Sequence, residues 1–447
     1  MGCLKTYRWF FAALLTLYLP LLAIDYFRHD DWMMLGTAVK KMPMEWPLLW
    51  KAYLYYAPDV KGAWFLRPFF LLAIYSNFHL FGYHYWLWIL EQIVLLGATL
   101  VLATDTLERI RGKASDSFIF LYIFLFCIPL HFASVLWMGE GLMNIPQVFL
   151  MVVCLYGFLK STKFGELPYL VAVLSYLAAL FFKESSIVLP FILFFVLFSQ
   201  GKLIEERFRL LLFFILGGIY FVCRFTLVVV NEGYHPVFNV ECFLKPLCVF
   251  LFFCFLGPLV LTVLSKVQKN ERPLFASPLL WIGYFSLIFL LILPHLGHWF
   301  FSPGWLYLPG FFASFLFPFL FKNPETLQKG IFSKGLVIFF LSVLPLGWQL
   351  SDIGWFSWGG IQKKAHRLVL DMDPKVIKRI NLIECPNPNY LKSDLSRVVG
   401  SYDSFQHMWY LAHDSKIKVV ELPCGTQVPK SPEVATLMYR FPEISLQ

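Results

Sequence analysis

The sequence predicts an all-α polytopic membrane protein that ends in a small α/β unit. Of its 447 residues, 59% are hydrophobic and only 15% are charged. A water-soluble fold would have too little polar surface to cover so much apolar surface. The apolar residues come in runs of about 17–25, the length that crosses a bilayer core about 30 Å thick.

We predict eleven membrane spans from these runs. They cover residues 9–25, 84–104, 118–136, 145–159, 167–182, 186–200, 210–230, 246–264, 278–294, 304–321 and 334–350. The stretch 67–82 is also apolar enough to span, but it has a proline near its start and contains Asn77 and His79. We interpret it as a re-entrant or interfacial helix on the outer side, with an ordinary span as the alternative. The predicted membrane module covers residues 1–353.

Clusters of Lys and Arg fall in every second loop of this arrangement. They precede the first span, follow the second, fourth, sixth and eighth, and border the tenth. Loops rich in Lys and Arg are typically cytoplasmic, which places the N-terminus in the cytoplasm and the C-terminus outside. The net charge of +9 then reflects topology, and no nucleic-acid partner is expected. The predicted outer segments are 26–66, 137–144, 183–185, 231–245, 295–303 and the tail from about 354.

The tail over 354–447 is more polar than the rest of the chain. Strand-like runs at 376–384 and 416–422 flank a segment with helical spacing at 404–413, which predicts a small α/β unit on the outer face. Its cysteines, Cys385 and Cys424, are able to form a disulfide if the tail is exoplasmic. The nine cysteines of the chain show no metal-ligand spacing.

Ionisable residues gather at the predicted outer ends of the spans. They are Asp30, Asp31, Arg67, Glu140, Lys183, Glu184, His295 and His298, with Arg224 one to two turns below the outer surface. Charged groups at membrane depth are costly and are usually functional. Some of them have a simpler alternative: Arg224 can snorkel, and Lys183 and Glu184 can be a surface pair. Glu91 lies nearer the midplane, where a helix–helix hydrogen bond is the alternative to a catalytic role.

Paired carboxylates next to basic residues suit one kind of chemistry at a membrane surface. Carboxylates act as general bases or metal ligands, and Arg and Lys hold phosphates. A base could deprotonate an acceptor hydroxyl while the cations stabilise charge on a leaving phosphate. The pattern therefore indicates group transfer from a lipid phosphate. A divalent cation is a possible cofactor, although the i, i+3 pair His295 and His298 is a weak metal signal.

The order of motifs resembles the GT-C glycosyltransferase superfamily, particularly protein O-mannosyltransferase-like (family 39-type) bacterial members and the related TMTC proteins. HDDW (29–32) is similar to their acidic pair after the first span. FLRPFFLLAIYSNFHLFG (65–82) is similar to their Arg-Pro helix, and FFKESSIVLP (181–190) to their Lys-Glu-Ser segment. Arg224 fits the arginine of a following span, and WFFSPGWLYLPGFF (299–312) resembles their aromatic turn. The resemblance runs over about residues 5–320.

The resemblance implies a GT-C transmembrane module and inverting sugar transfer from a polyprenyl-phosphate donor to a protein, lipid or glycan acceptor. It implies Asp30 as the catalytic base, with Asp31 beside it. The substrate-site candidates are Arg67, Glu140, Lys183, Glu184 and Arg224. The chain departs from the family where relatives often carry a glutamate, because it has Ser134 there and Glu140 further along.

Three other functions are alternatives to sugar transfer. A transporter or flippase of lipid-linked sugars would need polar residues through the midplane. A non-catalytic scaffold would tolerate loss of Asp30, and an oligosaccharide ligase or polymerase would use a lipid-diphosphate donor. The compact loops favour a bacterial inner membrane over the endoplasmic reticulum.

Overall fold

The structure is a computed structural model of the chain. It describes residues 67–127, 137–227, 277–293, 306–321, 355–385, 402–429, 431–440 and 443–447, together with 30–36 and scattered positions near 18–39, 131–135 and 244–251. The predicted spans 9–25, 246–264 and 334–350 lie almost entirely outside these residues. The predicted outer loops 231–245 and 295–303, with His295 and His298, also lie outside them.

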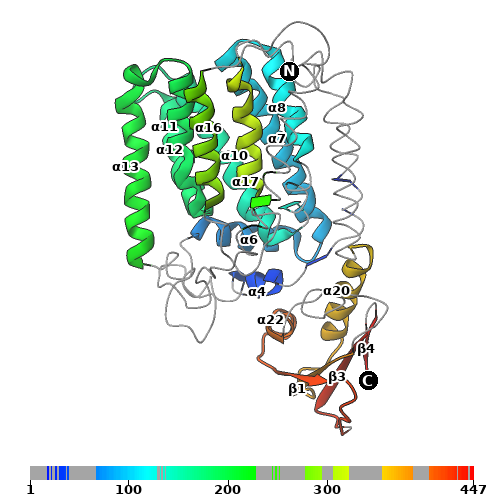
Figure 1. Cartoon of the computed structure of the whole chain (residues 1–447). Helices are drawn as coiled ribbons and strands as arrows, with labels where there is room; N and C mark the ends of the chain where they lie inside the picture. Colours follow the sequence, from blue (N-terminus) through cyan, green and yellow to red (C-terminus); the bar gives the residue numbers. More distant parts are fainter. Residues whose placement is uncertain are drawn as a thin grey trace, which may run out of the picture.

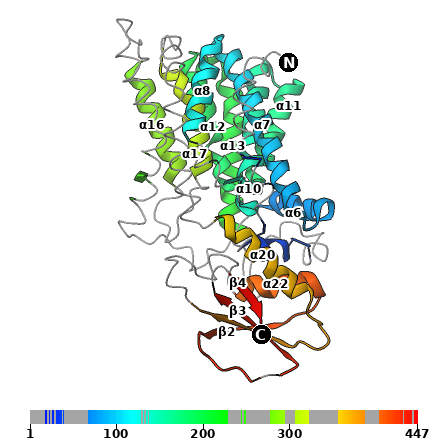
Figure 2. The ribbon, with the colours of Figure 1, turned by 90° about the vertical axis from the view of Figure 1, so that its right-hand side faces the viewer.

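The described chain is largely helical, with a bundle at one end and a small sheet at the other (Figure 1). The long axes of the bundle helices run in roughly one direction in both views (Figure 2). The helices are α7 (Tyr85–Arg111), α8 (Ala114–Phe126), α10 (Met138–Lys160), α11 (Leu167–Phe182), α12 (Leu189–Ser199), α13 (Leu203–Leu227), α16 (Pro278–Ile292) and α17 (Tyr307–Leu316). Two 3-10 turns, η4 (Glu184–Val188) and η9 (Phe317–Leu320), precede α12 and follow α17.

Two helices of the bundle are long and apolar enough to cross a membrane by length and composition, namely α7 and α10. Shorter apolar helices pack beside them. Many large apolar side chains on the outward faces of α11, α12, α13 and α16 are exposed in the described structure. Examples are Leu174 at 65%, Phe208 at 62% and Ile282 at 62%.

Four predicted segments need correction. The helix expected over 84–104 continues to Arg111, so Arg109 and Arg111 lie in α7 and not in the loop after it. The expected outer loop 137–144 is helical, because α10 begins at Met138. The loop before the seventh span is shorter than predicted, since α13 begins at Leu203 and includes Arg207 and Arg209. The helix expected over 118–136 runs from Ala114 to Phe126 instead.

The glycines of α10 explain why residues 137–144 read as a loop in the sequence. A Cβ on Gly139 would lie 2.6 Å from Sδ of Met34, and a Cβ on Gly141 would lie 2.6 Å from the carbonyl oxygen of Ser134 and would overlap the Gln92 amide. Glycine is unfavourable inside a helix, but here it permits the close approach of neighbouring elements. Tertiary packing therefore outweighs local propensity.

The end of the bundle away from the sheet carries basic side chains that bind helix C-termini. Arg209 donates from Nη2 to the carbonyl of Phe158 at 2.8 Å and also bonds Ser161, near the end of α10. Arg111, at the end of α7, donates to the carbonyl of Phe321 at 2.7 Å. Cations are favourable at these negative helix ends, and they satisfy carbonyls that lack partners within the helix.

The opposite end is covered by two helices that lie across the bundle axes. They are α6 (Pro68–Phe81) and the short α4 (Asp30–Gly36), between the bundle and the sheet (Figure 1). Asn77 of α6 donates a hydrogen bond to Glu91 of α7. The helix–helix hydrogen bond given above as the alternative role for Glu91 is therefore present.

The C-terminal unit is a four-stranded sheet in the order β2-β1-β3-β4. Its strands are β1 (Arg379–Glu384), β2 (Lys418–Pro423), β3 (Val434–Arg440) and β4 (Glu443–Leu446). β1 pairs in parallel with β2 and β3, and β4 is antiparallel to β3. The helices α20 (Trp355–Leu370) and α22 (Tyr402–His413) lie between the sheet and the bundle (Figure 2).

The predicted strands and helix of this unit are confirmed by β1, α22 and β2, whereas β3 and β4 were not predicted. The four central residues of β1 are all buried, and Ile380 and Leu382 belong to the apolar core of the described chain. Cys385 and Cys424 form a disulfide with a Cα–Cα distance of 4.8 Å. The disulfide joins the ends of β1 and β2, two neighbouring parallel strands.

Candidate functional site

The seven predicted site residues come from five different elements, and all lie at the end of the bundle that faces the C-terminal unit (Figure 1). Asp30 and Asp31 begin α4, Arg67 immediately precedes α6, and Glu140 is in the first turn of α10. Lys183 and Glu184 join α11 to η4, and Arg224 is in the last turn of α13.

Asp31 connects α4 to the start of α10. Its Oδ1 accepts a hydrogen bond of 2.9 Å from the backbone N–H of Gly139, and its side chain is fully buried. The N–H groups of a first helical turn have no partners within the helix, and the helix dipole favours a negative charge there. Asp31 is therefore held in place by α10. The backbone of its neighbour Asp30 is fixed at the same position, whereas the Asp30 side chain is outside the described part.

A salt bridge links Arg67 to Glu184. The guanidinium donates from Nε to Oε2 at 2.8 Å and from Nη2 to Oε1 at 2.5 Å, and Nη1 lies 2.9 Å from the sulfur of Met143. This two-pronged geometry matches the planar fork of arginine to both carboxylate oxygens. The Arg67 side chain is 8% exposed and that of Glu184 is 33% exposed. The pair fixes the start of α6 against the end of α11.

Lys183 belongs to a second polar chain on α10. Its ammonium donates to Oδ1 of Asn144 at 2.7 Å, and Nδ2 of Asn144 donates to Oε2 of Glu140 at 2.9 Å. Gln147 continues this face of α10 and donates to the hydroxyls of Ser185 and Ser186, each at 2.8 Å. Glu140, Asn144 and Lys183 are all buried, so each needs these partners.

Asn144 and Gln147 were not predicted as site residues. A signal for them exists in the sequence, because Glu140, Asn144 and Gln147 have the spacing i, i+4, i+7 that places side chains on one face of a helix. The prediction missed this signal because it assigned residues 137–144 to a loop, where helical spacing has no meaning.

Burial and nearby charges shift the pKa values of Lys183 and Glu184. Burial lowers the pKa of Lys183, Arg67 adds to this effect, and the carboxylates of Glu140 and Glu184 oppose it. Burial by itself would raise the pKa of Glu184, but the charge and hydrogen bonds of Arg67 outweigh it and hold the pKa at about 2. Arg224 contributes to the same lowering through its charge. Glu184 is therefore an anion at neutral pH that faces two arginines.

The C-terminal unit contacts the acid-bearing segment directly. Tyr26 and His366 of α20 share a hydrogen bond of 2.8 Å between the phenol oxygen and Nδ1. The His366 ring also lies 4.7 Å from the ring of Trp32 in α4 and 4.6 Å from that of Tyr83. Although the small sheet unit comes last in the sequence, these contacts pack it against the segment that carries Asp30 and Asp31.

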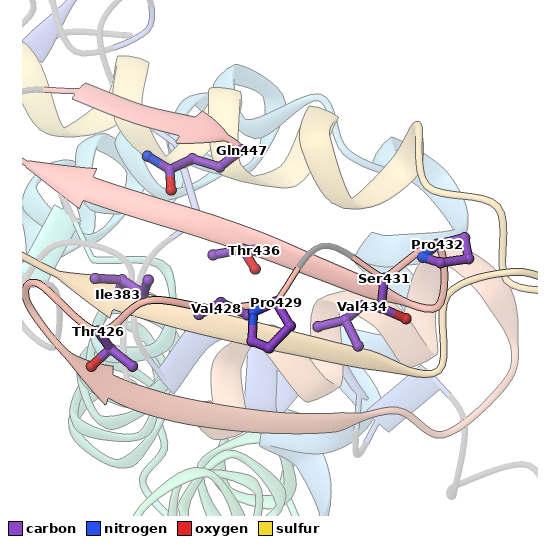
Figure 3. Close-up of a pocket in the computed structure, with 9 residues that line it drawn as sticks. All are labelled: Ile383, Thr426, Val428, Pro429, Ser431, Pro432, Val434, Thr436 and Gln447. Atoms are coloured by element: carbon purple, nitrogen blue, oxygen red, sulfur yellow. The ribbon is translucent and has the colours of Figure 1, made fainter.

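A pocket of about 470 Å³ lies elsewhere in the C-terminal unit (Figure 3). It is formed between the sheet and the chain that precedes β3. Its lining includes Ile383, Thr426, Val428, Thr436 and Gln447. None of the seven predicted site residues lines it, so it is separate from the charged end of the bundle.

No group of three or more His, Cys, Asp or Glu side chains within the described part of the chain has a metal-binding arrangement. Comparison of the sequence and structure with protein-family models, with curated proteins and with solved structures gives no match in any of the three.

Proposed function

We propose that this protein is an integral-membrane glycosyltransferase of GT-C type, which moves a sugar from a polyprenyl-phosphate donor to an acceptor hydroxyl on the outer side. The observation that carries the proposal is the convergence of acids and bases at one end of an apolar bundle. Arg67, Lys183 and Arg224 approach Glu184 or Glu140 there, next to the Asp30–Asp31 pair.

The surface of the bundle supports placement in a bilayer. Exposed Leu, Ile, Phe and Val side chains on α11, α12, α13 and α16 form an outer surface that lipid tails would cover. The basic residues that bind helix ends, such as Arg111 and Arg209, lie at the other end of the bundle, as expected for a cytoplasmic side. The disulfide of Cys385 and Cys424 favours an oxidising compartment for the sheet unit.

The residues divide into two roles in the proposed reaction. Asp30 takes the proton of the acceptor hydroxyl, the oxygen attacks the anomeric carbon, and the bond between that carbon and the phosphate oxygen breaks. The lipid phosphate leaves with an additional negative charge, which Lys183 and Arg224 stabilise. Asp31 is occupied by the Gly139 N–H, which favours Asp30 as the base.

Arg67 and Glu184 act indirectly in this scheme. Because Arg67 already gives two hydrogen bonds to Glu184, it is less available to a phosphate than a free arginine would be. Glu184 in turn holds Arg67 and attracts Arg224, and so sets the position of the positive charge. We assign the pair to positioning and Lys183 and Arg224 to phosphate binding.

The decisive experiment is sugar transfer in membranes from labelled polyprenyl-phosphate sugars. Asp30→Asn removes the base with little change in shape, so we expect activity to fall by about 10²–10⁴-fold at equal expression. Asp105→Asn is the matched control, because Asp105 pairs with Arg109 on an exposed face at the other end of α7. Full activity in Asp30→Asn would disprove the assigned base.

The same membranes separate this proposal from a flippase. A flippase would move the lipid-linked sugar across the bilayer of sealed vesicles without forming a glycosylated product. Donor translocation without product, unchanged in Asp30→Asn, would replace the transferase proposal with the flippase.

A further inference from the structure

The short helix α4 carries the acid pair and depends on other elements for its stability. With seven residues it is far below the length at which an isolated helix is stable in water. One anchor is the hydrogen bond from the Gly139 N–H to Asp31. This bond fixes the side of α4 that faces the bundle, and the opposite side faces the C-terminal unit.

The second anchor is His366 of α20. Its ring is 2% exposed, and it lies among Tyr26, which precedes α4, Trp32 within α4, and Tyr83, which follows α6. Nδ1 bonds the Tyr26 phenol at 2.8 Å. One side chain of the C-terminal unit thus contacts both the acid-bearing segment and the turn between α6 and α7.

The third contact is made by α22. A Cβ on Gly36, the last residue of α4, would overlap the ring of His407. Glycine therefore allows α22 to approach the end of α4 more closely than any other residue would. The two helices of the C-terminal unit hold α4 from the side opposite to α10.

We propose that His366 is a positioning residue, through which the C-terminal unit fixes α4 and thereby the placement of Asp30 and Asp31. The inference rests on the proposed function for its activity readout alone. The C-terminal unit then completes the site instead of acting as a separate binding module. Removal of the His366 hydrogen bond loosens α4 while the bundle stays folded.

The test compares three substitutions in the full-length chain. His366→Phe keeps a ring but loses the hydrogen bond to Tyr26, whereas His366→Asn retains a polar atom near the position of Nδ1. Tyr26→Phe removes the hydroxyl that bonds His366 and changes the side chain less. It is the variant to measure if His366→Phe does not fold. His79→Phe is the control, because His79 is an exposed histidine of α6.

The first readout is hydrogen–deuterium exchange of peptides that cover residues 30–36. We expect exchange to be roughly two- to tenfold faster in His366→Phe and Tyr26→Phe, the range for one lost buried hydrogen bond. We expect exchange close to wild type in His366→Asn and His79→Phe. Unchanged exchange in both His366→Phe and Tyr26→Phe would overturn the proposal, whatever the enzymatic result.

The second readout is sugar transfer in the same variants. We expect a loss of roughly tenfold or more in His366→Phe and recovery in His366→Asn, because small displacements of a catalytic group are costly. Faster exchange with full transfer would also overturn the proposal. If the wild type transfers no sugar, the proposed function fails, while the exchange measurement still decides whether His366 positions α4.

Discussion

The charged side chains of the candidate site that the structure describes have polar partners: Arg67 bonds Glu184, and Lys183 and Glu140 both bond Asn144. Arg67 and Glu184 show the principle, because the arginine is buried and its guanidinium donates two hydrogen bonds to the Glu184 carboxylate. A buried charge without a partner is strongly destabilising. Replacement of either residue of such a pair by a neutral one is therefore expected to lower the free energy of unfolding. The same reasoning explains why Asn144 lies between Lys183 and Glu140.

Replacement of Glu184 by glutamine tests this principle. Glu184→Gln leaves the Arg67 guanidinium without its counter-charge, and we expect the free energy of unfolding to fall by about 3 kcal/mol, the low end for a buried pair because Glu184 is one-third exposed. Thermal or denaturant unfolding in detergent measures the change. Asp105→Asn, at an exposed pair, should cost under about 0.5 kcal/mol.

The same pair has a defined pH dependence. The pKa of Glu184 is held at about 2, below its value of about 4.3 in an unfolded chain. Its contribution is therefore complete above about pH 4.5 and is lost as the pH falls toward 2. Glu184→Gln should lack this part of the acid-induced loss of stability. If the free energy of unfolding falls with acid in the same way in the wild type and in Glu184→Gln, the role given to Arg67 and Glu184 is contradicted.

At the scale of elements, the packing of α10 against α7 and α4 decides where the site residues lie. The first turn of α10 contains Gly139 and Gly141, and both lie close to neighbouring segments of the chain. This approach allows Asp31 to reach the Gly139 N–H and places Glu140 and Asn144 opposite Lys183. A helix with larger residues here would stand further from α7 and would separate these groups.

Gly141→Ala tests the packing. Its methyl group would overlap the Gln92 amide and lie 2.6 Å from the Ser134 carbonyl, so we expect destabilisation of about 1–3 kcal/mol. Gly97→Ala in α7 is the matched control, because a Cβ there meets nothing within 4 Å. The free energy of unfolding of Gly97→Ala should be unchanged or higher by about 0.5–1 kcal/mol. Equal unfolding temperatures for the two variants would show that α10 has room at Gly141.

For the molecule as a whole, the bundle and the C-terminal unit meet at the charged end. The sheet unit contributes His366 and His407 to that contact, and its own strands are tied by the disulfide. The disulfide closes a loop with a sequence separation of 39 residues. Such closure stabilises a fold chiefly by restricting the unfolded chain.

Loss of the disulfide should destabilise the C-terminal unit. For Cys424→Ser we expect a decrease of up to about 4 kcal/mol, the chain-entropy value for a loop of this length. Unfolding of the purified protein, followed with and without a reducing agent, measures it. Cys248→Ser replaces a free, exposed cysteine and should change nothing. If the reducing agent leaves the unfolding of the wild type unchanged, the disulfide does not stabilise the C-terminal unit.

The sequence predicted those features that depend on local pattern. Apolar runs predicted α11, α16 and the start of α7 closely, because such runs need no partner to be recognised. Short strand-like runs likewise predicted β1 and β2. The acidic and basic candidates were recognised from residue type and from their distance to predicted span ends.

Contacts between distant segments were decided only by the tertiary structure. Nothing local to 137–144 shows that its glycines permit close helix packing, so the start of α10 was taken for a loop, and Asn144 and Gln147 were missed. Nothing local to residue 366 pairs it with Tyr26, 340 positions away. By itself, the sequence determined the helical class, the chemical character of the site residues and the position of the C-terminal unit in the chain. The tertiary structure decided which charges pair and what holds α4, because those interactions depend on approach between segments far apart in the chain.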